Sequence, residues 1–407
     1  MIKSIKLTNF FSFRDEEIEL NPAANILIGV NGSGKSNLFK AINLLKVGVE
    51  GNADDSALRE LIIDKWGGFD NIYCKTEHEG DFRHSIGIEY RLNGAVLSRY
   101  GNGSMTFRED IVYKIVIIKK PATDNYYISE KISTASGYVY LDFINGSGKV
   151  RERQESGDIP PIVYDDYNPQ ELALSKISEF DKDRYLPLVT IKKAIRDIAV
   201  YTYFDTTENS KLRKGMSATS AAKKLLPDGG NLPQILNTIK INDKKHFRII
   251  QQKLQDVNEM FKGFDFNFLG SGIFELMLDE NHLNSAIHIT HVSDGTIRYL
   301  CLLAILYNPN RGALVCIDEP EIGLHPDMIY NITRGINEAA VDTTFLVATH
   351  SEEVVDGFEI ENLRIFEKDE ANTSIVKAYK ASDFQAWHDE LNPGPMWREG
   401  DLGGKRW

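Results

Sequence analysis

The sequence predicts an α/β fold built on a parallel sheet, with an antiparallel β region and a helical segment inserted into it. Two patterns predict the parallel sheet. A short apolar strand, a glycine-rich turn and an apolar-striped helix follow one another near the N-terminus, and strands alternate with helices over roughly the last hundred residues. A third pattern, strands of period two between about residues 80 and 155, predicts the antiparallel region.

The first fifty residues are expected to form strands, a turn and one helix. Alternating or continuously apolar runs predict strands at 4–10, 16–20 and 25–29. After the glycine-rich turn, apolar residues recur at helical spacing from Lys35 onward, so a helix is expected there.

The pattern becomes mainly helical between about residues 168 and 262, with no sustained heptad repeat, which excludes a long coiled-coil arm. The stretches expected to be helical are 169–180, 185–198, 231–240 and 243–261. Further strands are expected at 264–270, 273–280, 313–318 and 343–349, with a helix at 327–340. These shifts divide the chain into a first lobe at 1–155, a helical insertion at 156–284, a second lobe at 285–380 and a C-terminal tail at 381–407.

The composition indicates a globular protein of the cytoplasm. The chain has 42% hydrophobic and 26% charged residues, no apolar run long enough to cross a bilayer, and no signal-peptide pattern at its start. Its cysteines, Cys74, Cys301 and Cys316, are far apart, which favours free thiols over a metal site. We therefore expect no membrane association.

The net charge of −12 argues against a generally basic nucleic-acid binder. Basic stretches at 190–197, 210–215 and 241–248 leave a local basic groove open. Solvated helix faces are the more common reason for such runs.

The glycine-rich turn carries a complete phosphate-loop pattern. "GVNGSGKS", Gly29 to Ser36, matches G-x-x-x-x-G-K-[ST] at every fixed position. Glycines allow backbone N–H groups to converge on phosphate oxygens, while Lys35 reaches the β and γ phosphates and Ser36 ligates Mg²⁺. The residues expected to surround the phosphates are Gly29, Asn31, Gly32, Ser33, Gly34, Lys35, Ser36 and Asn37. The alternative, a plain glycine-rich turn with a surface lysine, lacks the strand and helix context seen here.

Acidic and imidazole side chains end the last two predicted parallel strands. Asp318 and Glu319 follow an apolar run, and His350 ends the next strand. Ligands of open α/β sheets bind at this edge, so Asp318 is expected to hold Mg²⁺ and Glu319 to deprotonate the attacking water. His350 is expected to contact the γ phosphate. The alternatives are an acidic cap on the next turn and a structural histidine.

In this order the motifs resemble an ABC-type ATPase head of the RecF, SMC and OLD-like group. The resemblance covers residues 1–45 and 285–380 and rests on the opening "IKLTNFFSFRD", the phosphate loop, Ser293-Asp294-Gly295-Thr296, Asp318-Glu319, Gly323-Leu324-His325-Pro326 and Thr349-His350-Ser351. It implies an ABC-type P-loop NTPase head that hydrolyses ATP. It also implies a homodimer that holds two ATP molecules between its heads, with Ser293 and Gly295 contacting the partner's ATP.

The sequence departs from the group at the signature. Ser-Asp-Gly-Thr replaces the usual Ser-Gly-Gly-Gln, so Asp294 brings a negative charge toward phosphates unless it faces away or pairs with a cation. Gln170 is a candidate for the group's metal-linking glutamine, although a surface helix explains it better. The candidates for lining the adenine and ribose are Asn9, Phe10 and Arg14.

The resemblance implies an ATP-dependent switch in DNA repair or anti-phage defence. Its expected partner is a separately encoded effector, such as a nuclease or toxin, and DNA is a further candidate partner. One rival is an ATP-regulated nuclease, for which Asp165 and Asp166 form the only tempting acidic pair; a TOPRIM nuclease domain would not fit after residue 380. A second rival is a scaffold that binds ATP without hydrolysing it, and a membrane transporter is the weakest. The tryptophan-rich tail should dock on the head itself or on a partner.

Overall fold

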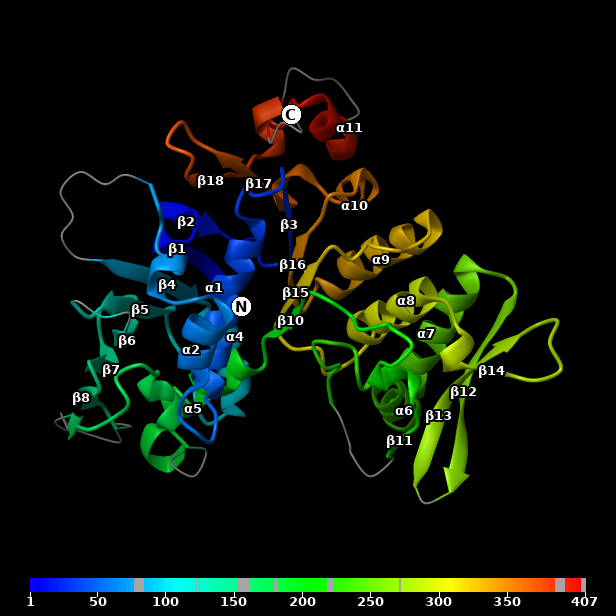
Figure 1. Ribbon diagram of the computed structural model, residues 1–407, viewed down its shortest axis with the longest axis horizontal. Helices are drawn as coiled ribbons and strands as arrows, with labels where there is room; N and C mark the ends of the chain where they lie inside the picture. Colours follow the sequence, from blue (N-terminus) through cyan, green and yellow to red (C-terminus); the bar gives the residue numbers. More distant parts are fainter. Residues whose placement is uncertain are drawn as a thin grey trace.

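A six-stranded sheet lies at the centre of the computed structural model, which describes residues 1–76, 84–121, 123, 125–152, 161–178, 182–217, 223–270, 272–384 and 392–403 (Figure 1). Its order is β10-β15-β16-β3-β17-β18, and neighbouring strands run parallel except β17 and β18. The strands are β3 (Ala24–Gly29), β10 (Ala199–Tyr201), β15 (Leu314–Asp318), β16 (Thr344–Ala348), β17 (Leu363–Lys368) and β18 (Ser374–Lys377). The expected parallel sheet is thus confirmed, while β10 was not foreseen.

An eight-stranded antiparallel sheet forms a second layer, in the order β2-β1-β4-β5-β6-β7-β8-β9. Its strands are β1 (Ile2–Phe10), β2 (Phe13–Glu19), β4 (Ser85–Leu92), β5 (Ile111–Lys119), β6 (Tyr126–Thr134), β7 (Val139–Ile144), β8 (Ser147–Val150) and β9 (Ile162–Tyr164). The predicted antiparallel region therefore joins the two N-terminal strands in one sheet.

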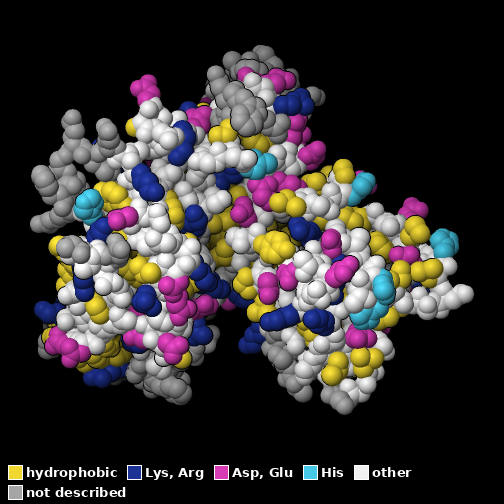
Figure 2. Space-filling model, viewed as in Figure 1, with side chains coloured by type: hydrophobic (Ala, Val, Ile, Leu, Met, Phe, Trp, Pro, Cys, Tyr) yellow, Lys and Arg dark blue, Asp and Glu magenta, His cyan; other side chains and the backbone are white. Residues whose placement is uncertain are grey.

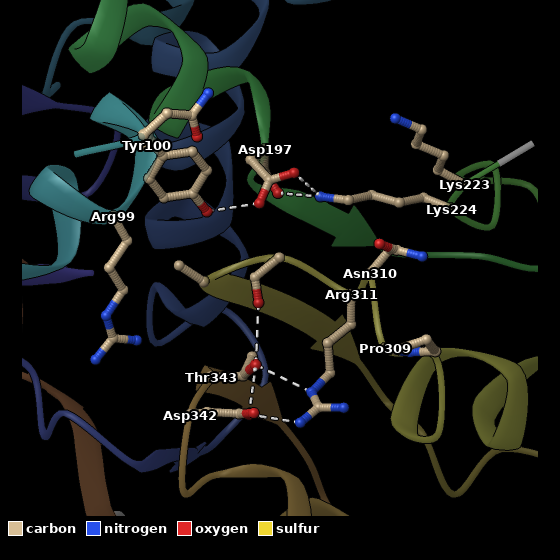
Figure 3. Close-up of a pocket in the computed structure, with 13 residues that line it drawn as sticks. Arg99, Tyr100, Asp197, Lys223, Lys224, Pro309, Asn310, Arg311, Asp342 and Thr343 are labelled. Atoms are coloured by element: carbon tan, nitrogen blue, oxygen red, sulfur yellow. Dashed lines mark hydrogen bonds and ion pairs between the residues drawn. The ribbon is translucent and has the colours of Figure 1, made fainter. Parts of the chain in front are cut away.

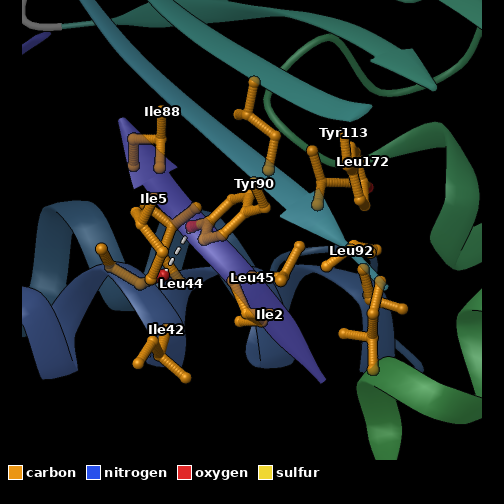
Figure 4. Close-up of a cluster of buried hydrophobic side chains, with 14 of the residues drawn as sticks. Ile2, Ile5, Ile42, Leu44, Leu45, Ile88, Tyr90, Leu92, Tyr113 and Leu172 are labelled. Atoms are coloured by element: carbon orange, nitrogen blue, oxygen red, sulfur yellow. Dashed lines mark hydrogen bonds between the residues drawn. The ribbon is translucent and has the colours of Figure 1, made fainter. Parts of the chain in front are cut away.

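Helix α1 (Lys35–Glu50) lies between these two sheets and is packed on its apolar stripe. Figure 4 shows Ile5 of β1, Tyr90 of β4 and Leu45 of α1 in one cluster, all fully buried. The Tyr90 hydroxyl donates a hydrogen bond to the Ala41 carbonyl oxygen at 2.6 Å, so the polar end of this buried ring is satisfied. The contact fixes α1, and with it the loop that precedes α1, against the antiparallel layer.

The other face of the central sheet is covered by α8 (Asp294–Leu306), α9 (Pro326–Ala339) and α10 (Glu352–Asp356) (Figure 1). Helices α6 (Leu232–Asn242) and α7 (Lys244–Val257) pack on α8. A small sheet lies beside them, formed by β11 (Met216–Ser217), β12 (Phe261–Gly270), β13 (Ile273–Glu280) and β14 (Ile287–His288). The apolar character of α8 on nearly all sides follows from its burial between these layers.

The remaining helical segments are short, apart from α5. They are α2 (Ala57–Arg59), the π-helix η1 (Glu60–Lys65), α3 (Phe69–Ile72), α4 (Gly94–Ser98), η2 (Arg99–Gly101), η3 (Ala173–Lys176), α5 (Lys182–Arg196), η5 (Lys211–Arg213), η6 (Ile289–His291), η7 (Ile360–Asn362), η8 (Ala381–Phe384) and α11 (Pro393–Glu399).

The helix expected at 169–180 was wrong over its described part. Only the short turn η3 forms there. The Glu171 carboxylate instead accepts hydrogen bonds from the backbone N–H groups of Leu58 and Arg59, which begin α2. A long-range cap has therefore overridden the local helical pattern. The boundaries at residues 155, 284 and 380 stay predictions.

The described part of the C-terminal tail docks on the head itself. Trp397 of α11 is 2% exposed and belongs to the core beneath α8 and α9. The Gly394 N–H donates to Asp356 at the end of α10, and Arg398 pairs with Glu352. Trp387 and Trp407 lie outside the described residues. No helix of the described chain combines the length and the apolar character that crossing a bilayer requires.

Candidate nucleotide-binding and catalytic site

The phosphate loop joins the end of β3 to the start of α1, and its shape requires glycine. Gly29 and Gly34 have φ of 145° and 115°. A Cβ on Gly29 would lie 2.3 Å from the Phe366 carbonyl oxygen, and one on Gly34 would lie 2.6 Å from Ser374 Oγ. Strands β17 and β18 therefore press directly on the loop, and only glycine allows that approach.

The loop leaves hydrogen-bond donors for a ligand. Helix α1 has Gly34 as its N-cap and no side-chain cap, so its first-turn N–H groups and positive dipole end face the loop. Ser33 Oγ is buried without a hydrogen-bond partner in the part of the chain that the structure describes. These groups suit an anion with several oxygen acceptors.

Lys35 is 6% exposed, and its Nζ donates to the Gly29 carbonyl oxygen at 2.7 Å and to that of Val30 at 3.4 Å. Burial lowers the pKa of Lys35, and the charges of Glu319 and Asp318 oppose that shift. The ammonium group is thus folded onto its own loop, in the pocket that it shares with the Asp318 and Glu319 carboxylates.

The structure brings the loop, the acidic strand end and the histidine around one pocket of about 290 Å³. Its lining consists of Asn31, Gly32, Ser33, Gly34, Lys35, Ser36, Asn37, Asp318, Glu319 and His350. Gly29 belongs to the loop but not to the lining. Ser293 and Gly295 lie on α8 at another place in the same chain, so the structure does not add them to this pocket.

Asp318 and Glu319 are held in unlike ways. Asp318 is the last residue of β15, and burial raises its pKa. Glu319 has a left-handed backbone with φ of 49°, and its N–H donates to the Ala348 carbonyl oxygen of β16 at 2.8 Å. Such strain in a non-glycine residue persists only where the surroundings enforce it, and it clusters at functional sites.

Glu319 has its pKa raised to about 8, first by burial and then by the neighbouring Glu321 carboxylate. Its Oε1 lies 3.3 Å from His350 Nε2. The carboxyl group therefore shares a face of the pocket with the imidazole.

Glu321 is a residue that the sequence patterns did not single out. Its Oε1 accepts hydrogen bonds from Thr349 Oγ1 at 2.6 Å and from the backbone N–H groups of His350 and Ser351 at 2.9 and 3.1 Å. It thereby fixes the loop that carries His350. The available signal was its place two residues after Glu319 in the acidic run "DEPE".

The Ser293 segment begins α8 as predicted. Ser293 Oγ accepts from the Thr296 N–H at 3.2 Å, which is a helix N-cap. A Cβ on Gly295 would lie 2.5 Å from the Gly323 carbonyl oxygen, so this glycine lets the loop after β15 approach α8. Within the chain, the close approach at Gly295 is to backbone.

Asp294 pairs with a cation. The Arg213 side chain is 5% exposed, and its guanidinium donates to Asp294 Oδ1 at 2.5 Å. The same guanidinium donates to the carbonyl oxygens of Thr206, Ile289, Thr290 and Val292. The unexpected acid is thus part of an arginine-centred clamp on the loop before α8. Because its side chain is buried in this clamp, Arg213 of the basic stretch 210–215 is not a surface contact for nucleic acid.

The candidates for the adenine and ribose line neither of the two pockets at the phosphate loop. Phe10 is fully buried, Asn9 Nδ2 donates to the Ser85 carbonyl oxygen, and Arg14 is exposed on β2 outside the pocket lining. A second pocket of about 410 Å³ adjoins the phosphate loop. It is lined by Phe11, Ser12, Asn37, Asn71, Tyr73, Cys74, Lys75, Thr76, Lys368, Ala371 and Asn372. Phe10 ends β1 and enters the core, whereas Phe11 lies in the turn after β1, where a left-handed backbone with φ of 50° brings it to this pocket.

Gln170 does not line the phosphate pocket. Its carbonyl oxygen accepts a hydrogen bond from Tyr126, and its N–H donates to Asn168. Asp165 and Asp166 are exposed, and no cluster of three or more metal-ligating side chains occurs among the described residues. The Asp165–Asp166 pair therefore receives no supporting acid there.

Comparisons with known proteins agree with this geometry. Residues 1–355 match the family model "AAA ATPase domain". The DNA replication and repair protein RecF of Idiomarina loihiensis is 31% identical over 106 residues, which is 24% of this chain and 28% of that protein. The Retron Ec83 probable ATPase of Escherichia coli is 27% identical over 161 residues, 36% of this chain and 29% of that protein. The chain thus spans under a third of the length of these two relatives.

Solved structures show the same fold. The SMC head bound to the C-terminal winged-helix domain of ScpA superposes with a TM-score of 0.58 at 15% identity, covering 95% of this chain and 99% of that one. Because the family model matches most of the chain, the chain belongs to the AAA ATPase domain family, and its fold is that of an ABC-type ATPase head.

Proposed function

We propose that the chain binds ATP with Mg²⁺ in the phosphate pocket and hydrolyses it. The observation that carries this proposal is the convergence of Lys35, Asp318, Glu319 and His350 on one pocket beside the uncapped start of α1. These residues come from three neighbouring strands and offer amides and an ammonium to phosphate, a carboxylate to metal and a second carboxylate to water.

Each group has a distinct task in this proposal. The first-turn amides of α1 and Lys35 bind the β and γ phosphates, and Ser36 and Asp318 hold Mg²⁺. The ion, when bound, neutralises phosphate charge and lowers the pKa of nearby carboxyl groups. Glu319 then accepts a proton from the attacking water, and His350 orients toward the γ phosphate. Glu321 keeps His350 in place.

The second half of the proposal is a homodimer closed by ATP. The Ser293 cap is exposed, and the positive end of α8 points outward beside it. Ser293 and Gly295 would meet the phosphates held by a second copy, as the resemblance to ABC-type heads implies. Dimer closure and opening would make the chain a switch.

We further propose that the switch serves DNA repair or anti-phage defence, through DNA or a separately encoded effector such as a nuclease or toxin. A RecF protein and a retron ATPase are among the relatives.

Substitution of Glu319 by Gln tests the catalytic assignment. Gln keeps the size and the polarity of the side chain but accepts no proton, so ATP turnover should fall by about 10²-fold or more while ATP binding remains. Phosphate release and nucleotide affinity are measured on the same protein. Unchanged turnover would show that Glu319 is not the base, and no turnover in the wild-type chain would favour the ATP-bound scaffold.

A further inference from the structure

A second charged cleft lies at the opposite edge of the central sheet. Ala313 and Thr343 immediately precede β15 and β16, whereas Asp318 ends β15 and His350 follows β16 at the phosphate pocket. The cleft has a volume of about 650 Å³. It is lined by Arg99, Tyr100, Asn102, Asp197, Lys223, Lys224, Pro309, Asn310, Arg311, Gly312, Ala313, Asp342 and Thr343 (Figure 3).

Its charge is opposite to that of the whole protein. Four cations line it against two carboxylates, which leaves a net charge of +2 in a chain of net charge −12. Figure 2 shows Lys and Arg side chains beside the hollow between the two halves of the molecule. A concentration of positive charge in a recess raises the local concentration of anions.

Both carboxylates of the cleft are already neutralised. Asp197 accepts a hydrogen bond from the Tyr100 hydroxyl at 2.6 Å and pairs with Lys224. Asp342 pairs with Arg311 at 2.5 Å, and Thr343 also donates to it. These pairs account for two of the four cations and hold the side chains of the cleft in place, as the dashed lines of Figure 3 show.

The other two cations remain available. Within the described part of the chain, the side chains of Arg99 and Lys223 have no hydrogen-bond or ion-pair partner, and both are exposed. Arg99 belongs to η2, and Lys223 precedes α6, so the two charges come from the two sides of the cleft. A ligand that satisfied both would bridge segments far apart in the sequence.

We propose that this cleft binds a small phosphate-bearing anion with at least two negative charges, between inorganic pyrophosphate and a mononucleotide in size. Arg99 and Lys223 would contact its phosphate oxygens, since guanidinium and ammonium groups form strong charge-assisted hydrogen bonds with phosphate. The volume of the cleft lies in the range of small-molecule sites.

The observations favour a small anion over a nucleic acid. A duplex presents one negative charge per about 1.7 Å of axis and is bound through extended tracks of cations. Here only two cations are available, and they stand among acids that are already paired, so the cleft offers no extended track of cations.

Equilibrium dialysis with radiolabelled inorganic pyrophosphate tests the proposal on the purified full chain. The number of sites per chain is measured for the wild type and for the double variant Arg99→Glu and Lys223→Glu. The double variant should lose one site, and the milder Arg99→Gln should weaken that site about tenfold or more. Lys35→Ala should affect only the other site, which separates this inference from the proposed nucleotide site.

A matched control carries the same change of charge elsewhere. Arg108 and Lys114 are exposed and outside the cleft, so Arg108→Glu with Lys114→Glu should bind pyrophosphate as the wild type does. Equal site numbers in the wild type and the cleft variant, or equal loss in the control, would overturn the proposal. So would a duplex oligonucleotide that binds through Arg99 and Lys223 while pyrophosphate does not bind.

Discussion

Arg213 is expected to be the residue that keeps the Ser293 loop in shape, and its replacement by Met is the most direct test. The buried guanidinium donates to carbonyl oxygens of Thr206, Ile289, Thr290 and Val292, at 2.9 to 3.1 Å. Methionine fills a similar volume but leaves these carbonyl oxygens unpaired. At about 1 kcal/mol for each lost bond, the free energy of unfolding should fall by about 3–5 kcal/mol.

The ion pair with Asp294 contributes much less to this sum. The Asp294 side chain is 64% exposed, so solvent screens the pair. Asp294→Ala should therefore cost less than about 1 kcal/mol of stability. The clamp thus depends mainly on the hydrogen bonds from Arg213 to carbonyl oxygens. The ion pair with Asp294 neutralises the acid at the signature but adds little stability.

Urea denaturation and ATP-dependent dimerisation are measured on Arg213→Met and Asp294→Ala. Arg213→Met should unfold at lower urea and dimerise poorly at a temperature where it is still folded. Arg334→Met is the control, because Arg334 is an exposed arginine on α9, paired within the helix to Glu338. If Arg213→Met is as stable as this control and dimerises normally, the clamp does not hold the loop.

Three further outcomes are expected. Ser293→Asp keeps a good helix cap but brings a negative charge to the expected phosphate contact. The melting temperature should therefore change little, whereas ATP-dependent dimerisation, followed by light scattering, should be lost. Normal dimerisation of this variant would show that Ser293 is only a helix cap. Burial raises the pKa of Glu130 to about 7, so its protonation stabilises the fold below its ordinary pKa and that contribution is lost as pH rises to about 7. Glu130→Gln should flatten the unfolding free energy against pH between about 4.5 and 7 by about 3 kcal/mol, and an unchanged slope would contradict this. Trp397→Ala should release α11 from α10 at a cost of about 3 kcal/mol, detected as faster proteolysis of the tail, and unchanged cleavage would show that the docking contributes little.

Much of the fold follows from contiguous patterns. The strand, glycine turn and helix around Lys35 are adjacent in sequence, and the strands that lead to Asp318 and His350 are continuous apolar runs. Once such strands are parallel neighbours, their ends meet at one edge of the sheet. The pocket of phosphate loop, acids and histidine was therefore predictable before any tertiary contact was known.

Other features needed the tertiary structure, because they join residues with no shared period. Glu321 fixes the loop of His350 from 29 residues away, and Arg213 reaches Asp294 from 81 residues away. The same holds for Arg99 and Lys223, which line opposite sides of the basic cleft, and for the helix lost at 169–180.

The sequence by itself determined the phosphate loop, the acid-tipped strand and the order of the motifs, since local spacing and backbone chemistry specify them. Only the tertiary structure decided how Asp294 is neutralised, that Phe11 rather than Phe10 meets the pocket, and that a basic cleft opens at the other edge of the sheet. The physical reason is that charge pairing and burial depend on which distant segments are brought into contact. The periodicity of a sequence does not specify those contacts.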